Sequence, residues 1–450
     1  MIRKLMIAAT ALVLAAPMAL AQPIAIVNAR IETAGAAGAI AKGAIVMDKG
    51  RIVAVGANVT APAGARVIDA KGATVTPGFI AGSSNLTVTE IGAVTETRDD
   101  RAGKLSAGFD VQYGVNPKST MIPLARQSGL TRAIVTPIRG GGGGGHAHDD
   151  AGASGHDEFA GGGGGGEGDP PLFAGQAAAV RLADATDLVT KARIAVVLDL
   201  GEAGARNAGS RGAALVLVRS ALEDARAFAR NRSAYEQGAT REFGLSRIDL
   251  EALVPVAQGR TPLLVRVNRA ADIRETLRLA REQKIRVILE GAAEGWMVAD
   301  ELAAAGVPVL IDPQANLPES FETLGARLDN AARLHKAGVT VGILGSRDVN
   351  NLRQARFNAG TAVAYGLPYQ AALRAVSSNI ASMWGLSDIG SLEVGKAADV
   401  VLWSGDPFET TTWPNAVFIS GVEQPANVRA FELRDRYAAP AGALAPQYRN

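Results

Sequence analysis

The middle of the chain alternates continuous apolar runs with stretches of helical periodicity. Continuous apolar runs are typical of parallel strands that are covered on both faces. The expected strands lie at 133–135, 194–198, 263–267, 286–289, 307–311 and 339–344. The expected helices between them include 270–283, 294–305 and 328–336. Strands separated by helices over about 300 residues predict a (β/α)₈ barrel of the TIM type.

The two ends of the chain have a different pattern, in which short strands are separated by turns. Strands are expected at 24–27, 44–47 and 51–55, and again at 399–403 and 416–419. Lys49-Gly50 has the composition of a hairpin turn between two of them. We predict that both ends form one small β-sandwich. The resulting division is a composite sandwich domain over 22–75 and 388–425, a barrel domain over 76–387, and a C-terminal tail over 426–450.

One segment interrupts the barrel pattern. After Arg139-Gly140 the chain reads "GGGGGHAHDDAGASGHDEFAGGGGGGEGD", with almost no large apolar residue. Such a segment cannot bury enough surface to offset its ordering entropy. Residues 140–168 are therefore predicted to be a disordered insertion on a barrel loop.

Residues 1–21 have the features of a secretory signal peptide. Arg3 and Lys4 precede an apolar run over 5–16, and Ala19-Leu20-Ala21 fits a small-x-small cleavage site. The chain contains no cysteine, which excludes a disulfide framework and thiol chemistry. These features together predict export to a bacterial periplasm.

Charge and composition narrow the function further. Hydrophobic residues make up 48% of the chain and charged residues 20%, which are ordinary globular values. The net charge of +2 and the lack of any Lys/Arg-rich run argue against nucleic acid as a partner. No segment after the signal peptide is long and apolar enough to suggest a membrane span in the mature chain.

Three stretches stand out as motifs: "VIDAKGATVTPGFIAGSSNL" at 67–86, "RVILEGAAEGWMVADELAAAGVPVLI" at 286–311 and "GSLEVGKAADVVLWSGDPFE" at 390–409. They resemble the amidohydrolase superfamily, in its imidazolonepropionase-like branch. The resemblance implies a barrel with a metal site at the carboxyl ends of its strands. It also implies hydrolysis of carbon–nitrogen bonds in non-peptide or cyclic amides.

The resemblance also shows that the ligand positions are substituted. In the family, strand one ends in His-x-His, strands five and six each supply a histidine, and strand eight supplies the aspartate that activates water. No position is evident for the strand-four lysine or glutamate. The matching positions here are Ser83 and Asn85, Arg266, Gly291 or Ala293, and Ser346 or Asp348.

These substitutions disfavour a metal centre. Catalytic metals prefer imidazole nitrogen or carboxylate oxygen, whereas serine and asparagine are weak neutral donors. The Arg266 guanidinium has no lone pair to give. Its charge at about 4 Å from a dication costs on the order of 8 kcal/mol at an effective dielectric of about 20. We therefore expect no cofactor, with zinc as the alternative.

Several polar residues remain as candidates for a site. Ser83, Asn85 and Arg266 could bind a substrate or an anion, or they could be satisfied structural residues. Arg266 could instead form an ion pair with Glu294 or Asp348, and these two carboxylates are also the catalytic candidates. Glu294 begins a helix, where a carboxylate is favourable whatever its function.

The histidines of the chain add no candidate for a catalytic residue. His335 lies in an amphipathic helix and is expected to be a surface or packed residue. His146, His148 and His156 lie in the insertion with several carboxylates, so weak binding of zinc, copper or nickel there is an alternative to an inert loop.

Three functions follow from these observations. The first is an exported amidohydrolase-like protein without its metal centre, acting as a non-catalytic binding or assembly partner. Its partner would be an active amidohydrolase sibling or a second copy of the chain, and a small-molecule ligand is compatible with it. The second is an active hydrolase of carbon–nitrogen bonds with a divergent site around Asp348, Glu294 and Arg266. The third is a weak metal-sequestering protein that acts through the insertion.

Overall fold

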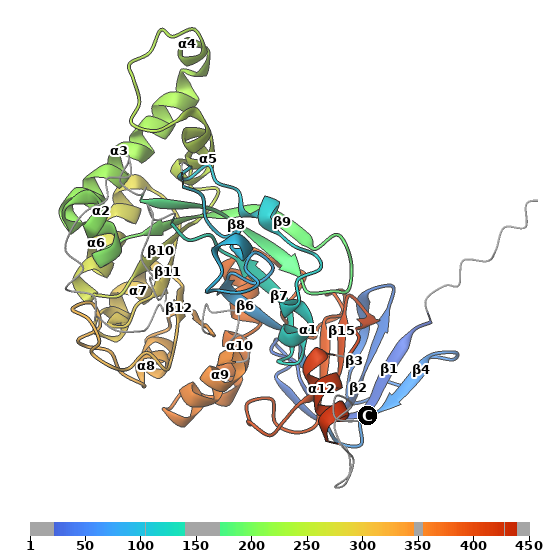
Figure 1. Cartoon of the computed structure of the whole chain (residues 1–450). Coiled ribbons are helices and arrows are strands. Elements are labelled where there is room, and N and C mark those ends of the chain that lie inside the picture. The colour runs from blue at the N-terminus through green and yellow to red at the C-terminus, as the bar shows by residue number, and fades with distance from the viewer. Residues whose placement is uncertain (1–21, 104, 140–171, 346–353, 427, 439–450) are drawn as a thin grey trace, which may run out of the picture.

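The computed structural model describes residues 22–103, 105–139, 172–345, 354–426 and 428–438. The predicted signal peptide, the insertion over 140–168 with its three histidines, and Asp348 lie outside these residues. No helix in the described part of the chain is long and apolar enough to cross a membrane. Figure 1 shows a barrel-like body that carries a projecting helical arm on one side and a sheet on the other.

Strands from both ends of the chain form one eight-stranded sheet, the composite sheet. Its order is β16-β15-β14-β5-β1-β2-β3, and β4 pairs with β1. The β2–β3 turn at Lys49-Gly50 is confirmed, because both residues have positive φ, as a two-residue hairpin turn requires. The strands are β1 (Ile24–Glu32), β2 (Ala39–Asp48), β3 (Arg51–Gly56), β4 (Arg66–Asp69), β5 (Thr74–Pro77), β14 (Val400–Trp403), β15 (Pro414–Ile419) and β16 (Val422–Glu423).

The two ends meet where β14 pairs antiparallel with β5. The hydrogen bonds join all of these strands into a single sheet, so a sandwich of two packed layers stays a prediction.

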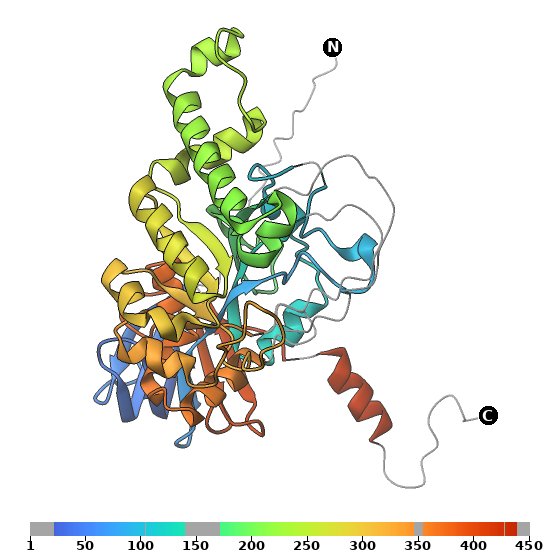
Figure 2. The same ribbon diagram turned by 90° about the vertical axis from the view of Figure 1, so that its left-hand side faces the viewer.

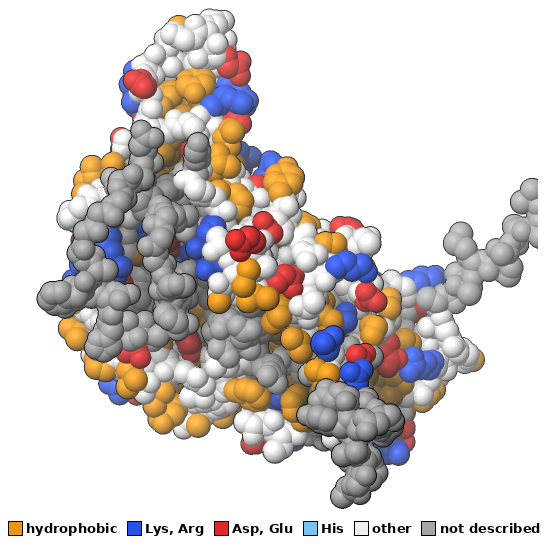
Figure 3. Space-filling model, in the orientation of Figure 1, with side chains coloured by type: hydrophobic (Ala, Val, Ile, Leu, Met, Phe, Trp, Pro, Cys, Tyr) orange, Lys and Arg blue, Asp and Glu red, His pale blue; other side chains and the backbone are white. Residues whose placement is uncertain are grey.

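In the C-terminal tail, α12 (Arg429–Tyr437) is the last described helix. On the face drawn in Figure 3, basic and acidic side chains are interspersed.

The second sheet is the barrel, whose eight strands follow one another in the order of the chain. They are β6 (Phe79–Ser84), β7 (Leu130–Val135), β8 (Phe173–Arg181), β9 (Val189–Asp199), β10 (Leu263–Val267), β11 (Val287–Gly291), β12 (Val309–Ile311) and β13 (Val341–Ile343). The six strands expected in the middle of the chain all lie in this sheet.

The expectation of a wholly parallel (β/α)₈ sheet was wrong at one strand. β8 runs antiparallel to both β7 and β9, while the other neighbouring pairs are parallel. Only residues 182–188 connect β8 to β9. A link this short can join antiparallel neighbours but cannot carry the chain back to start a parallel strand, which needs about a dozen residues or more.

The interior of the barrel is apolar at its amino-terminal end. Ile134, Val197, Leu264, Ile288 and Leu310 belong to one buried cluster with residues of α11 (Ser378–Met383). α11 lies between the edge strands β6 and β13, which do not pair with each other.

Two glycines leave space for side chains between the edge strands β6 and β13. A Cβ on Gly82 would lie 3.1 Å from a Leu310 methyl carbon and 3.3 Å from Ile380 Cδ1. A Cβ on Gly342 would lie 2.6 Å from the same Leu310 methyl carbon. Glycine at both positions therefore lets the two side chains fill the gap between the edge strands.

Helices cover the outside of the barrel. Between β6 and β7 lie η1 (Thr95–Thr97), η2 (Val111–Gly114) and α1 (Met121–Arg126). The later connections contain α2 (Gly201–Ala208), α3 (Arg211–Arg230), α4 (Arg232–Glu236), α5 (Arg247–Ala257), α6 (Ala270–Gln283), η3 (Gly295–Val298), α7 (Ala299–Ala305), α8 (Asn330–Lys336), α9 (Gln354–Ala364) and α10 (Tyr369–Ala375). The predicted helix 270–283 is confirmed with the same bounds.

The outer end of α3, α4 and the start of α5 project from the body as an arm (Figure 2). Aromatic contacts hold the arm together: Tyr235 meets Phe228 edge-to-face at 5.0 Å and stacks on Phe243 at 5.7 Å, measured between ring centroids. The buried Asp224 carboxylate accepts hydrogen bonds from Arg241 and from the Gly244 N–H.

The composite sheet is fixed to the barrel through buried side chains. Trp403 is fully buried, lies 5.4 Å from Phe79 between ring centroids, and donates its indole N–H to Thr76 Oγ1 at 2.9 Å. Arg132 of β7 forms a two-point ion pair with Asp399, at 2.6 and 3.1 Å. The chain passes directly from β5 to β6 at Gly78, where a Cβ would collide with Thr131.

We expect Trp403→Ala to lower the free energy of unfolding by about 3–5 kcal/mol, because it leaves a cavity at this junction. Trp413→Ala is the matched control, since Trp413 is 42% exposed. Urea unfolding of the three proteins measures the difference. Equal losses for the two variants would contradict the role assigned to Trp403.

Candidate functional site

The carboxyl ends of three neighbouring barrel strands place charged side chains together. Asp199 ends β9, Arg266 lies next to last in β10, and Glu290 lies next to last in β11. In the ladder, Arg266 is the Cα partner of both Asp199 and Glu290. Each follows an inward-facing apolar residue by two positions, so the three side chains turn into the barrel mouth.

Arg266 uses all three of its guanidinium nitrogens within the protein. Nε donates to Glu290 Oε1 at 3.3 Å, Nη1 to Asp199 Oδ1 at 3.2 Å, and Nη2 to the Pro137 carbonyl at 3.1 Å. The side chain is 18% exposed. Burial favours a lower pKa for Arg266, but the charges of Glu290 and Asp199 outweigh it and raise that pKa. The guanidinium is therefore a permanent cation between two carboxylates.

Further polar side chains complete this arrangement. Asp199 Oδ2 accepts from Arg139 Nε at 2.7 Å. Glu290 Oε2 accepts from the Ser83 hydroxyl at 2.9 Å, and Ser83 Oγ lies 2.7 Å from Thr136 Oγ1. We call this set the mouth network; its members are Ser83, Thr136, Arg139, Asp199, Arg266 and Glu290.

The strand-one candidates occupy different environments. Ser83 is 3% exposed and belongs to the mouth network. Asn85 comes just after β6, and its buried Oδ1 accepts no hydrogen bond from the described residues. Of these two residues, only Ser83 is linked to Arg266, through Glu290.

Another buried carboxylate follows β12. Asp312 Oδ1 accepts from Asn358 Nδ2 at 2.8 Å and from the Gln314 N–H at 2.9 Å. Burial raises the pKa of the Asp312 carboxyl. Its hydrogen bonds hold α9 and the start of the β12–α8 loop against the barrel.

Glu294 does not bind Arg266, so the first of the two carboxylates considered as partners of Arg266 was wrong. Its Oε2 accepts from the Ala270 N–H at 2.9 Å and its Oε1 from the Gly325 N–H at 3.1 Å. Gly291 and Ala292 have positive φ, so the chain turns sharply before Glu294 and leads toward the start of α6. There its carboxylate satisfies one free backbone donor at the start of α6 and one in the β12–α8 loop.

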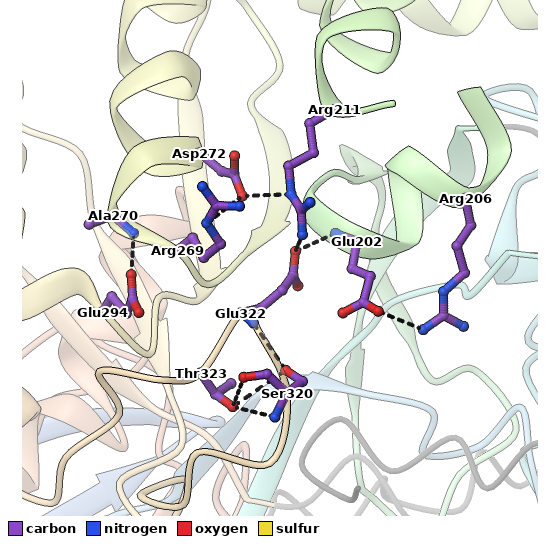
Figure 4. A network of polar contacts seen from close by, with 10 residues as sticks. All are labelled: Glu202, Arg206, Arg211, Arg269, Ala270, Asp272, Glu294, Ser320, Glu322 and Thr323. Carbon is purple, nitrogen blue, oxygen red and sulfur yellow. Dashed lines mark hydrogen bonds and ion pairs between the residues drawn. The ribbon is translucent and has the colours of Figure 1, made fainter. Parts of the chain in front are cut away.

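The β12–α8 loop is fastened across the neighbouring helix starts (Figure 4). Glu322 accepts hydrogen bonds from the Glu202 N–H at the start of α2 and from Arg211 Nη2 of α3. Arg211 Nε also donates to Asp272 in α6, at 3.2 Å. Gly201 has φ +71°, and a Cβ there would collide with the Glu322 carboxylate. This loop therefore links three helices on the carboxyl side of the barrel.

The remaining predicted residues lie away from this site. Asp348, His146, His148 and His156 lie outside the described residues. His335 lies near the end of α8, which leads into the amino end of β13, opposite the mouth. Burial lowers the pKa of His335.

Sequence reasoning missed Asp199, Glu290 and Glu322. The first two carry the same signal that singled out Arg266, a charged residue at the carboxyl end of an apolar strand. Asp199 also fills the strand-four position that had no assignment. Glu322 lies in a loop, where nothing in the local pattern marks it.

Residues 268–427 match the sequence model of the amidohydrolase family. Over these residues, about the last third of the chain, the protein is similar to amidohydrolases. Amidohydrolase tasK of Hapsidospora irregularis is 33% identical over 92 residues, which cover 20% of this chain and 9% of that protein. The chain therefore spans only a small part of that curated relative.

Solved amidohydrolases share the fold. The amidohydrolase from Thermotoga maritima MSB8 is 24% identical, with a TM-score of 0.74, over 89% of this chain and 99% of its own. Molinate hydrolase is 17% identical, with a TM-score of 0.51, over 95% of this chain and 98% of its own.

The metal centre that the resemblance to amidohydrolases implies does not fit the described mouth. No three His, Asp or Glu side chains in the described ranges converge closely enough to hold a metal ion. The carboxylates Asp199 and Glu290 do lie where ligands would be needed, but both already bind the Arg266 guanidinium. A metal ion beside that fixed cation would be repelled rather than held.

We expect Arg266→Met to lower the free energy of unfolding by about 3–5 kcal/mol, because it leaves Asp199 and Glu290 without their shared cation. Arg206→Met is the matched control, since the Arg206–Glu202 pair is exposed at 76% and 41%. Chemical unfolding at neutral pH measures both. A change for Arg266→Met as small as the control's would contradict the role of the network.

The stability held by Glu322 should depend on pH. Burial raises the pKa of this carboxyl, against the opposing hydrogen bonds from the Glu202 N–H and Arg211. A raised folded-state pKa gives a contribution that is largest in acid and is lost as pH rises through that pKa. Glu322→Gln should therefore gain stability relative to the wild type between about pH 4 and about pH 7. Urea unfolding at both pH values tests this, and a difference that shrinks or stays constant would contradict it.

Proposed function

We propose that this protein is a non-catalytic binding or assembly protein, built on an amidohydrolase barrel in which an internal ion-pair network replaces the metal centre. The observation that carries the proposal is the Arg266 guanidinium, which binds Asp199 and Glu290 at the carboxyl ends of the strands. The Arg266 guanidinium neutralises the two converging carboxylates, as a bound metal ion would do in a metal-dependent barrel.

Two of the residues named for a divergent hydrolase, Glu294 and Arg266, support the same proposal, while Asp348 lies outside the described residues. Both Glu294 oxygens are bound to backbone N–H groups, so this carboxylate is already engaged. Each guanidinium nitrogen of Arg266 already donates a hydrogen bond within the protein, so only one N–H on Nη1 and one on Nη2 are left for a substrate carboxylate or phosphate. An active enzyme would need a base and a water-activating group from elsewhere in the chain.

The proposal also covers the localisation of this protein, its branch of the superfamily and its partner. The basic, apolar and small-residue pattern of residues 1–21 supports export to the periplasm. The three motif stretches support a place in the imidazolonepropionase-like branch. An active amidohydrolase sibling, or a second copy of this chain, is the partner that a retained but inactive barrel favours.

Ser83→His together with Asn85→His should not create a zinc site. The imidazole at position 83 would lie beside Glu290, which Arg266 already binds, while Gly291 still offers no side chain. Elemental analysis of the purified wild type and double variant should therefore show no stoichiometric zinc. A screen with carbon–nitrogen hydrolase substrates should show no turnover by either protein.

A deletion separates the insertion from the barrel as a source of metal. Removing residues 140–168 takes away His146, His148 and His156, so any weakly bound zinc should be lost with them. Stoichiometric zinc that survives the deletion, or zinc-dependent hydrolysis, would overturn the proposal in favour of an active hydrolase.

A further inference from the structure

A cavity lies at the amino end of the barrel, on the side away from the mouth network. Its volume is about 430 Å³, and it lies between the β2–β3 turn, the starts of β7 and β9, and the segment 385–389. Leu386, Ile389 and Ala397 are buried apolar residues of its wall. The composite sheet and the barrel therefore build this cavity together.

Cationic side chains dominate the polar part of the wall. Lys49, Arg51, Arg132 and Lys191 all line the cavity, whereas Asp388 is its one lining carboxylate among the described residues. Arg132 is neutralised by the buried Asp399 behind it. Arg51 approaches Asp388 only at 4.0 Å, with both side chains more than half exposed.

The two lysines have no carboxylate partner within 4.0 Å in the described part of the chain. Lys191 Nζ donates to the Gly385 carbonyl at 3.2 Å, which leaves further N–H donors of its ammonium group. Lys49 lies in the two-residue turn and is exposed. Positive charge in the cavity thus exceeds negative charge by about the two units that a phosphate monoester carries near neutral pH.

We propose that this cavity is a binding site for a phosphate group, either on a small molecule or on a lipid head group. Lys49, Lys191 and Arg51 supply the charged donors, and the apolar wall gives room for the group that carries the phosphate. A volume of about 430 Å³ is larger than a bare phosphate needs and falls in the range of small-molecule sites. The site lies opposite the mouth network and does not depend on the function proposed for it.

Calorimetric titration with inorganic pyrophosphate tests the small-molecule source, and sedimentation with vesicles that contain phosphatidic acid tests the lipid source. We expect one molecule of pyrophosphate per chain, or vesicle binding, in low salt, and weaker binding as sodium chloride is added. Lys49→Gln with Lys191→Gln should weaken that binding roughly tenfold or more.

Lys42→Gln with Lys118→Gln is the matched control, because it removes the same charge from two exposed lysines that do not line the cavity. Binding of pyrophosphate that the first pair weakens and the control does not supports a soluble phosphate ligand. The same result with vesicles alone supports a lipid head group. No binding of either probe, or equal binding by both double variants, would overturn the site.

Discussion

The barrel mouth depends on a single shared cation. Two carboxylates that converge at the ends of parallel strands repel each other, and in a partly buried setting they need a positive charge between them. Arg266 provides it, and the same contact fixes the register of β9, β10 and β11, because the three residues are direct partners in the ladder. A slip of one residue would turn Arg266 outward into the apolar layer under the helices.

The loops above the mouth are held by the same kind of chemistry. Glu294 and Glu322 each place a carboxylate on backbone N–H groups at helix starts, and Arg211 links Glu322 to Asp272. The charged groups of this face therefore bind one another and the backbone. The active-site face of an enzyme needs polar groups that are held in place and still accessible to a substrate. Here the main polar groups are already bound to one another or to the backbone.

At the amino end of the barrel, by contrast, not every described charged side chain has a partner of opposite charge. Its amino-terminal rim meets the composite sheet, and the junction is fixed by Trp403 and by the Arg132–Asp399 pair. Close by, Lys49 and Lys191 lie without carboxylate partners in the described part of the chain, beside a cavity. The charges open to a ligand thus lie at the end of the barrel that usually serves stability alone.

The sequence by itself determined six of the barrel strands and the helix α6. Period and length fixed β10 and α6 at their observed bounds, and Lys49-Gly50 specified its turn, because these signals are local. Arg266 and Ser83 could be singled out as candidate site residues for the same reason, since each lies near the end of a recognisable apolar strand. Only the tertiary structure decided that Arg266 pairs with Asp199 and Glu290, which lie 67 and 24 residues away in the chain. It also decided the direction of β8, because side-chain alternation is the same for a strand that runs either way, and only its neighbours and its short link to β9 set that direction.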